Sequence, residues 1–122
     1  MFFKSPDAAA LREWDARWLG VEGDEHGVMF ATDKMPAGAL TVWSPFPQST
    51  AYFDPSADAF MFNLIVDDLD GALDQVRAGG AKVIGTIEEY DYGRFGWFID
   101  PDGHKVELWR PPPAGGKQPA SS

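Results

Sequence analysis

The sequence predicts an α+β fold built from two βαβββ modules, and two observations lead to this prediction. Residues 60–109 give, in order, the patterns of a strand, a helix and three further strands. The first half repeats this order in weaker form: the pair Ala-Leu at residues 10–11 recurs at residues 72–73, and residues 40–43 align with residues 106–109. Modules repeated in this way cannot bury their sheets alone, so we expect them to form one curved mixed sheet around a cleft.

The second module carries the clearer signals. Its first strand, residues 60–66, alternates apolar side chains on both faces, with Asn63 as the single polar residue. Asp67 and Asp68 offer caps to a helix that ends at a pair of glycines, residues 79–80. Three β-prone runs follow, and the turn sequence Asp-Pro-Asp-Gly joins the last two; the runs are residues 82–87, 94–99 and 105–109.

The first module, about residues 1–44, has similar elements with less regular patterns. Ser5-Pro6-Asp7 predicts the start of a helix that ends near Gly20. Residues 27–32 and 40–44 read as strands.

A connector at residues 45–59 separates the modules. It is rich in Pro and Ser but carries aromatic side chains, so we expect it to cross the surface of the domain. Module two spans residues 60–110, which gives a single domain over residues 1–110. Residues 111–122 form a Pro/Gly/Ser tail with nothing to bury, and we expect this tail to be flexible.

Composition excludes several classes of protein. The chain has 122 residues, 44% of them hydrophobic, which suits one domain with a modest core. Its formal net charge of −9 argues against nucleic acid or an anionic membrane surface as partners, because both need a positive face. The absence of cysteine excludes disulfides and zinc-thiolate sites, and the apolar run at Met1-Phe2-Phe3 is too short for a signal peptide or a membrane span. We therefore expect a soluble cytoplasmic protein.

Three stretches carry a resemblance to a known family: the strand that runs into Asp67-Asp68-Leu69, residues 92–97 (YGRFGW) and residues 100–109 (DPDGHKVELW). With the order of the modules, they resemble the glyoxalase / bleomycin resistance protein / extradiol dioxygenase superfamily, also called vicinal oxygen chelate. The resemblance covers nearly the whole chain, and it identifies a fold far better than a reaction.

The resemblance also implies where a metal would bind. Metal-dependent members carry His, Glu or Gln on the inner faces of the first and last strands of each module. By the repeat alignment these positions hold Met1 or a residue upstream, Thr41, Asn63 and Glu107. Only Glu107 matches, and the other three side chains are poor donors for a divalent ion. The metal site is therefore expected to be degenerate, with Glu107 as its only candidate ligand and no cofactor assigned.

Glu107 points to the inner face, because Val106 and Leu108 take the other face of its strand. One interpretation is a general base whose pKa is raised by burial with few partners; the other is an acceptor of hydrogen bonds inside the fold. Asn63 and Thr41 are candidates for substrate binding, although Asn63 also suits a structural hydrogen bond to Glu107.

The glycine-containing connection near Tyr92 and Arg94 is a second candidate for substrate binding. Its residues are suited to close over an anionic or aromatic ligand, or to form a hairpin in which the tyrosines pack on the sheet and Arg94 pairs with nearby acids. Trp97 belongs to an aromatic set that would line the cleft. His26 and His104 are expected to be exposed and not catalytic.

Three functions stay open. The first is binding of a small organic molecule in an aromatic cleft, without established catalysis. The others follow from the resemblance: a metal-assisted lyase, isomerase or dioxygenase, and an antibiotic-sequestering resistance protein. A homodimer is expected, because short members of the family associate and because Trp14 and Trp18 on one short helix leave apolar surface that a second copy would cover.

Overall fold

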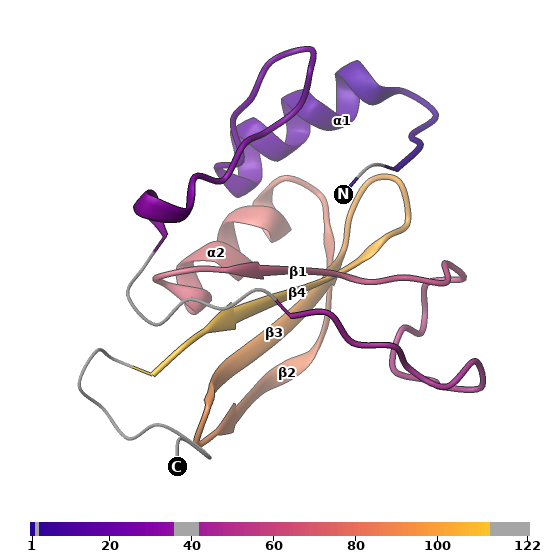
Figure 1. Cartoon of the computed structure of the whole chain (residues 1–122), viewed down its shortest axis with the longest axis vertical. Helices are drawn as coiled ribbons and strands as arrows, with labels where there is room; N and C mark the ends of the chain where they lie inside the picture. The colour runs from indigo at the N-terminus through magenta and orange to yellow at the C-terminus, as the bar shows by residue number, and fades with distance from the viewer. Residues whose placement is uncertain (2, 36–41, 113–122) are drawn as a thin grey trace.

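Residues 62–110 form the βαβββ unit that the sequence predicts (Figure 1). The structure is a computed structural model that describes residues 1, 3–35 and 42–112. The elements of the unit are β1 (Phe62–Ile65), α2 (Leu69–Ala78), β2 (Lys82–Tyr90), β3 (Gly93–Ile99) and β4 (Lys105–Arg110).

The four strands make one mixed sheet in the order β1-β4-β3-β2. β1 pairs with β4 in parallel, whereas β4 with β3 and β3 with β2 are antiparallel. A parallel pair requires a long crossover, and α2 lies within the connection that supplies it. This mixed sheet with its helices confirms the α+β fold class.

Helix α2 begins where the sequence predicts. The carboxylate of Asp68 accepts from the backbone N–H of Gly71 at 3.0 Å and so caps the helix. One face of α2 packs on the sheet in a core of Leu69, Leu73, Val76, Phe98, Val106 and Leu108. Gly96 permits this close approach, because a Cβ there would lie 2.7 Å from Leu73 Cδ1.

The two faces of the sheet differ in character. Residues that pair directly across strands point to the same face, so the register assigns each side chain to a face. The face away from α2 carries Glu107, its partners Asn63 and Trp97, and the pair Phe95 and Trp109. We call this the site face.

The first half contributes a helix at the predicted place. The N-terminal helix α1 (Ala8–Trp14) is capped by Asp7, whose carboxylate accepts from the N–H of Ala10 at 3.0 Å. A π-helical turn, Asp15–Leu19, extends it to Gly20, which adopts a φ of 74°. Figure 1 shows α1 beyond α2, and the indole of Trp14 joins the two by donating to the carbonyl of Gly79 at 2.8 Å.

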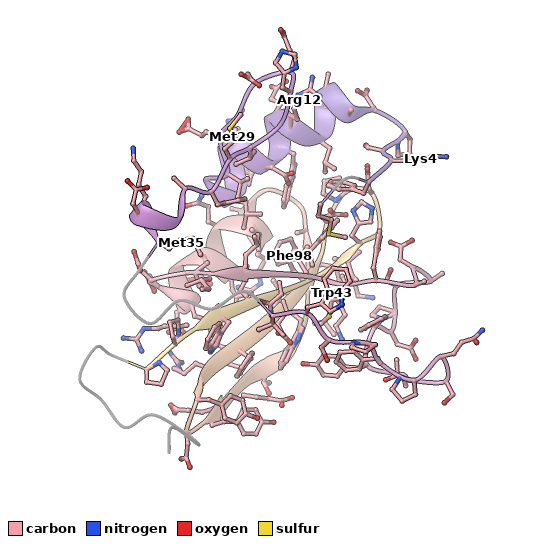
Figure 2. The ribbon with its side chains drawn as sticks, in the orientation of Figure 1. Lys4, Arg12, Met29, Met35, Trp43 and Phe98 are labelled. Atoms are coloured by element: carbon pink, nitrogen blue, oxygen red, sulfur yellow. The ribbon has the colours of Figure 1, made fainter. Side chains whose placement is uncertain are left out.

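The strands predicted in the first half are not formed in the part of it that the structure describes. The prediction for residues 27–32 is wrong: Gly27 forms an isolated bridge with Asp24, and the rest is coil up to a short 3-10 turn, Thr32–Lys34. Met29 beside α1 is 89% exposed (Figure 2). The strand predicted at residues 40–44 lies partly outside the described residues, and its described part is coil with Trp43 95% exposed. A strand needs a neighbour to take its backbone hydrogen bonds, and in the described part of the first half this pairing is limited to the single bridge between Asp24 and Gly27.

The predicted domain organisation is not tested by the described residues. Residues 113–122, most of the predicted tail, lie outside the described residues, and the boundaries of the modules stay a prediction. Over the described ranges, none of the helices combines the length and the apolar character that crossing a membrane requires.

Candidate functional site

The carboxylate of Glu107 is the meeting point of three hydrogen bonds from three segments. Trp97 Nε1 on β3 donates to Oε2 at 2.9 Å, the hydroxyl of Tyr52 in the connector donates to Oε2 at 2.5 Å, and Asn63 Nδ2 on β1 donates to Oε1. Asn63 and Trp97 reach it because the register pairs each of them directly with Glu107 on β4. We call Tyr52, Asn63, Trp97 and Glu107 the Glu107 cluster.

The cluster changes the interpretation of Glu107. It is only 7% exposed, as expected for an inward residue, and its three donors match the interpretation as an acceptor inside the fold better than that of a base with few partners. The three donors satisfy both oxygens of the buried side chain. Glu107 therefore acts first as an acceptor, and it would have to release a donor before it took a proton from a substrate.

Tyr52 is the donor that comes from outside the sheet. Burial, followed by the hydrogen bond to Glu107, raises the pKa of Tyr52, so its phenol keeps its proton and remains a donor. The ring of Tyr52 stands edge-on to Trp97, with centroids 6.3 Å apart and planes at 89°.

Lys105 supplies a positive charge two residues before Glu107 on the same face of β4. Its Nζ donates to the backbone carbonyl of Tyr52 at 2.5 Å and lies 5.0 Å from the centre of the Tyr52 ring. Burial lowers the pKa of Lys105, against the attraction of Glu107, Asp54 and Glu88. An acid and an amine thus stand side by side at one end of the cluster.

Parallel aromatic rings extend the site face away from the cluster. Phe95 lies nearly parallel to Trp97 at 16° and to Trp109 at 11°, with centroids 6.4 and 6.2 Å apart. Beyond Phe95, Tyr90 and Tyr92 stack on each other at 5.2 Å and turn their edges to it. The result is a row of rings with one polar centre at Glu107.

The structure brings together some of the site residues predicted from sequence and not others. Asn63, Trp97 and Glu107 meet in the cluster, and Tyr92 lies at the far end of the aromatic row. Arg94 lies on the face of α2 instead, where it pairs with Asp70 at 3.1 Å and with Glu89 at 3.7 Å. This arrangement matches the hairpin interpretation of that stretch. Thr41 lies outside the described residues.

Two residues of the site were missed from sequence. Tyr52 lies in an irregular connector, and no local pattern marks a contact with a residue 55 positions away. Lys105 offers a signal, because strand alternation places it on the same face as Glu107.

His104 corrects another expectation, since it is buried and not exposed. Its Nδ1 lies 2.8 Å from a carboxylate oxygen of Asp100, and its ring is surrounded by aromatic rings at 5.2–5.5 Å, those of Phe3, Phe60 and Phe62. These contacts stabilise the turn between β3 and β4. His26 is exposed as predicted.

The residues around Glu107 do not fit a metal ion. The indole of Trp97 can only donate, and Tyr52 and Asn63 also point hydrogens at the carboxylate as they are arranged, so a cation at Glu107 would face hydrogens in place of lone pairs. Met1, at another predicted ligand position, is 82% exposed. In the described part of the chain, His, Cys, Asp and Glu side chains nowhere gather in a group of three or more suited to a metal.

A cavity of about 300 Å³ lies between α2 and β2, on the opposite face of the sheet from the Glu107 cluster. It is located where the register of β2 shifts between Ile84 and Glu88. Its walls are apolar at Leu73 and Val83, and they include Trp97. The sheet at Trp97 therefore separates this cavity from the Glu107 cluster.

The chain is similar to known proteins at the level of family and of fold. A family model described as a glyoxalase-like domain matches residues 1–109. No curated protein matches the chain.

The solved structures that resemble this one include two with a TM-score above 0.5. The first is TnmS3, an antibiotic binding protein from Streptomyces sp. CB03234, with 22% identity, a TM-score of 0.51 and coverage of 88% of this chain and 89% of that one. The second is a protein of unknown function from Agrobacterium tumefaciens str. C58, with 19% identity, a TM-score of 0.54 and coverage of 90% and 94%. At these identities the likeness is one of fold.

Proposed function

The chain belongs to the glyoxalase-like domain family, and on this premise we propose that it binds a small, planar, partly apolar organic molecule on the site face. One observation carries the proposal: a buried carboxylate with converging donors stands at the end of a row of parallel aromatic rings. Sites for small molecules combine an apolar surface with a few placed polar groups in this way.

The energetics of Glu107 support a ligand. Burying a carboxylate costs free energy even when it is hydrogen-bonded, and a leucine at this place would let the surrounding rings pack without that cost. A buried carboxylate at this place is therefore better explained by a hydrogen bond to a polar group of a ligand than by the stability of the fold. The neighbouring Lys105 supplies a donor of opposite charge for a second polar group of the same ligand.

Binding is favoured over metal-assisted chemistry because the donors around Glu107 do not fit a metal ion. TnmS3, which shares the fold, is an antibiotic binding protein. Sequestration of an antibiotic by this chain is a special case of the proposal, in which the planar molecule is a drug.

Titration of planar aromatic probes tests the proposal. We would titrate 2-naphthol, coumarin and flavone into the wild type, Glu107→Gln and Trp43→Phe, and follow binding by calorimetry. At least one probe is expected to bind the wild type with a micromolar Kd. Glu107→Gln should weaken binding about tenfold, since a hydrogen bond to a charged group is worth about 1.5–3 kcal/mol.

Trp43→Phe is the matched control, because Trp43 is 95% exposed and its substitution should leave the Kd unchanged. Probes that all bind more weakly than millimolar, or that bind Glu107→Gln as well as the wild type, would overturn the proposal.

A further inference from the structure

Tyr52 contacts three residues of the site face, each through a different group. Its hydroxyl donates to Glu107 at 2.5 Å, its ring stands edge-on to Trp97 at 6.3 Å, and its backbone carbonyl accepts from Lys105 Nζ at 2.5 Å. The Lys105 ammonium also lies 5.0 Å from the centre of the phenol ring. Tyr52 thus places a phenol hydroxyl on Glu107, a ring edge on Trp97 and a carbonyl on Lys105 at the same time.

The segment that carries Tyr52 has little other attachment to the sheet. Residues 42–49 are exposed, and Phe46, at 44% exposure, stacks on Tyr52 itself at 5.6 Å. Within the described part of residues 42–53, the hydrogen bonds that reach the sheet are those of Tyr52 to Glu107 and Lys105. In Figure 1 the connector forms the loops that lie away from α1. Opening the site therefore requires the release of one side chain and one carbonyl.

We propose that Tyr52 is a built-in surrogate for the ligand, and that the ligand is a hydroxyaromatic compound with a carbonyl group. Its hydroxyl would donate to Glu107, its ring would pack against Trp97, and its carbonyl would accept from Lys105. This inference rests on the proposed function and names the chemical class that the same site takes.

The hydroxyl of the ligand decides which chemical class of ligand the site prefers. An aromatic ligand without a donor would displace the Tyr52 hydroxyl from Glu107 and leave the buried carboxylate short of one hydrogen bond. Such a loss next to a charged group costs about 1.5–3 kcal/mol, or roughly tenfold to a hundredfold in affinity. The site therefore discriminates in favour of phenols.

Tyr52 also sets the affinity, because it competes with the ligand. A tethered group acts at an effective concentration in the millimolar range, and a ligand that binds only the open state loses affinity by the fraction that is closed. Removing the tyrosine side chain should therefore tighten binding of the phenol.

Calorimetry with two matched probes tests the inference. The probes are 4-hydroxyphenylacetamide, which carries both the hydroxyl and the carbonyl, and 4-methoxyphenylacetamide, which lacks the donor. Tyr52→Ala is expected to bind the hydroxyl probe at least about tenfold more tightly than the wild type does, and at least about tenfold more tightly than it binds the methoxy probe. Adding Glu107→Gln to Tyr52→Ala should largely remove this preference.

Tyr52→Phe keeps the ring and removes only the competing hydroxyl, so it tests the same point if Tyr52→Ala does not fold. It should bind the hydroxyl probe more tightly than the wild type does. Equal affinity of the two probes, or no gain in either variant, would overturn the inference. If 2-naphthol, coumarin or flavone nevertheless binds in a manner that depends on Glu107, the ligand class fails while the proposed function stands; if they do not bind either, both fail.

Discussion

Substituting Glu107 by glutamine should destabilise the fold by about 1–2 kcal/mol, and the hydrogen bonds of the cluster set this magnitude. The new amide is expected to place its oxygen where Oε2 accepts from Trp97 and Tyr52, because the indole N–H can only donate. Its nitrogen then faces Asn63, whose own exposed amide can flip to present an oxygen. The variant would thus keep all three hydrogen bonds, with the one to Asn63 reversed in direction.

What Glu107→Gln loses is charge. Hydrogen bonds to charged groups are worth about 1.5–3 kcal/mol and neutral ones about 0.5–1.5, so weakening two of them costs up to a few kcal/mol. Relief of the cost of burying the charge offsets part of this, which leaves about 1–2 kcal/mol.

Urea denaturation followed by circular dichroism measures the difference. Glu89→Gln is the matched control, because it makes the same chemical change on a side chain that is 69% exposed and 3.7 Å from Arg94. This control should stay within about 0.5 kcal/mol of the wild type. A Glu107→Gln protein as stable as the wild type, or more stable, would show that the three donors do not hold the carboxylate as described.

Four further predictions concern other parts of the chain. Burial, with Asp100 and Asp102 nearby, raises the pKa of Asp15 from 3.8 to about 6, so between these two values the folded state holds a proton that the unfolded state has lost. The free energy of unfolding should therefore rise as the pH falls from 7 through 6 toward 4. Urea titrations at each pH should show a smaller rise for Asp15→Asn. The protein is expected to be a homodimer, and a monomer mass by light scattering at high micromolar concentration would contradict this. Deletion of residues 112–122 should change neither the melting temperature nor ligand binding, and a loss of several degrees in a thermal scan would show that these residues contribute to the fold. Protein purified without added metal should carry far less than one equivalent of zinc, nickel, manganese or iron by elemental analysis, whereas a full equivalent that Glu107→Ala removes would revive the metal-enzyme interpretation.

The second module could be predicted because its signals are local. The cap at Asp68, the alternation around Asn63 and the turn at residues 100–103 each lie within a few residues of the element they define. Glu107 followed from the same logic, since alternation alone assigns its face. Its partners Asn63 and Trp97 lie directly across from it once the strands are in register.

Other features depend on contacts between distant segments, and local patterns do not record these. Tyr52 reaches Glu107 across 55 positions, from a connector with no periodicity. The burial of His104 depends on rings from Phe3, Phe60 and Phe62, although its own turn sequence is typical of an exposed loop. The strand predicted at residues 27–32 failed for a related reason, because apolar residues favour a strand only where a neighbouring strand is present.

The most direct test of the site is the indole N–H of Trp97, observed by nuclear magnetic resonance in ¹⁵N-labelled protein. The chain has five tryptophans, and each indole gives its own signal. Trp14 is the internal control, because its indole donates to the carbonyl of Gly79 at 2.8 Å on the other side of the sheet. Addition of 4-hydroxyphenylacetamide is predicted to shift the Trp97 signal, which Trp97→Phe identifies, and to leave the Trp14 signal in place. A Trp97 signal that does not move while the Trp14 signal does would contradict a ligand site centred on Glu107.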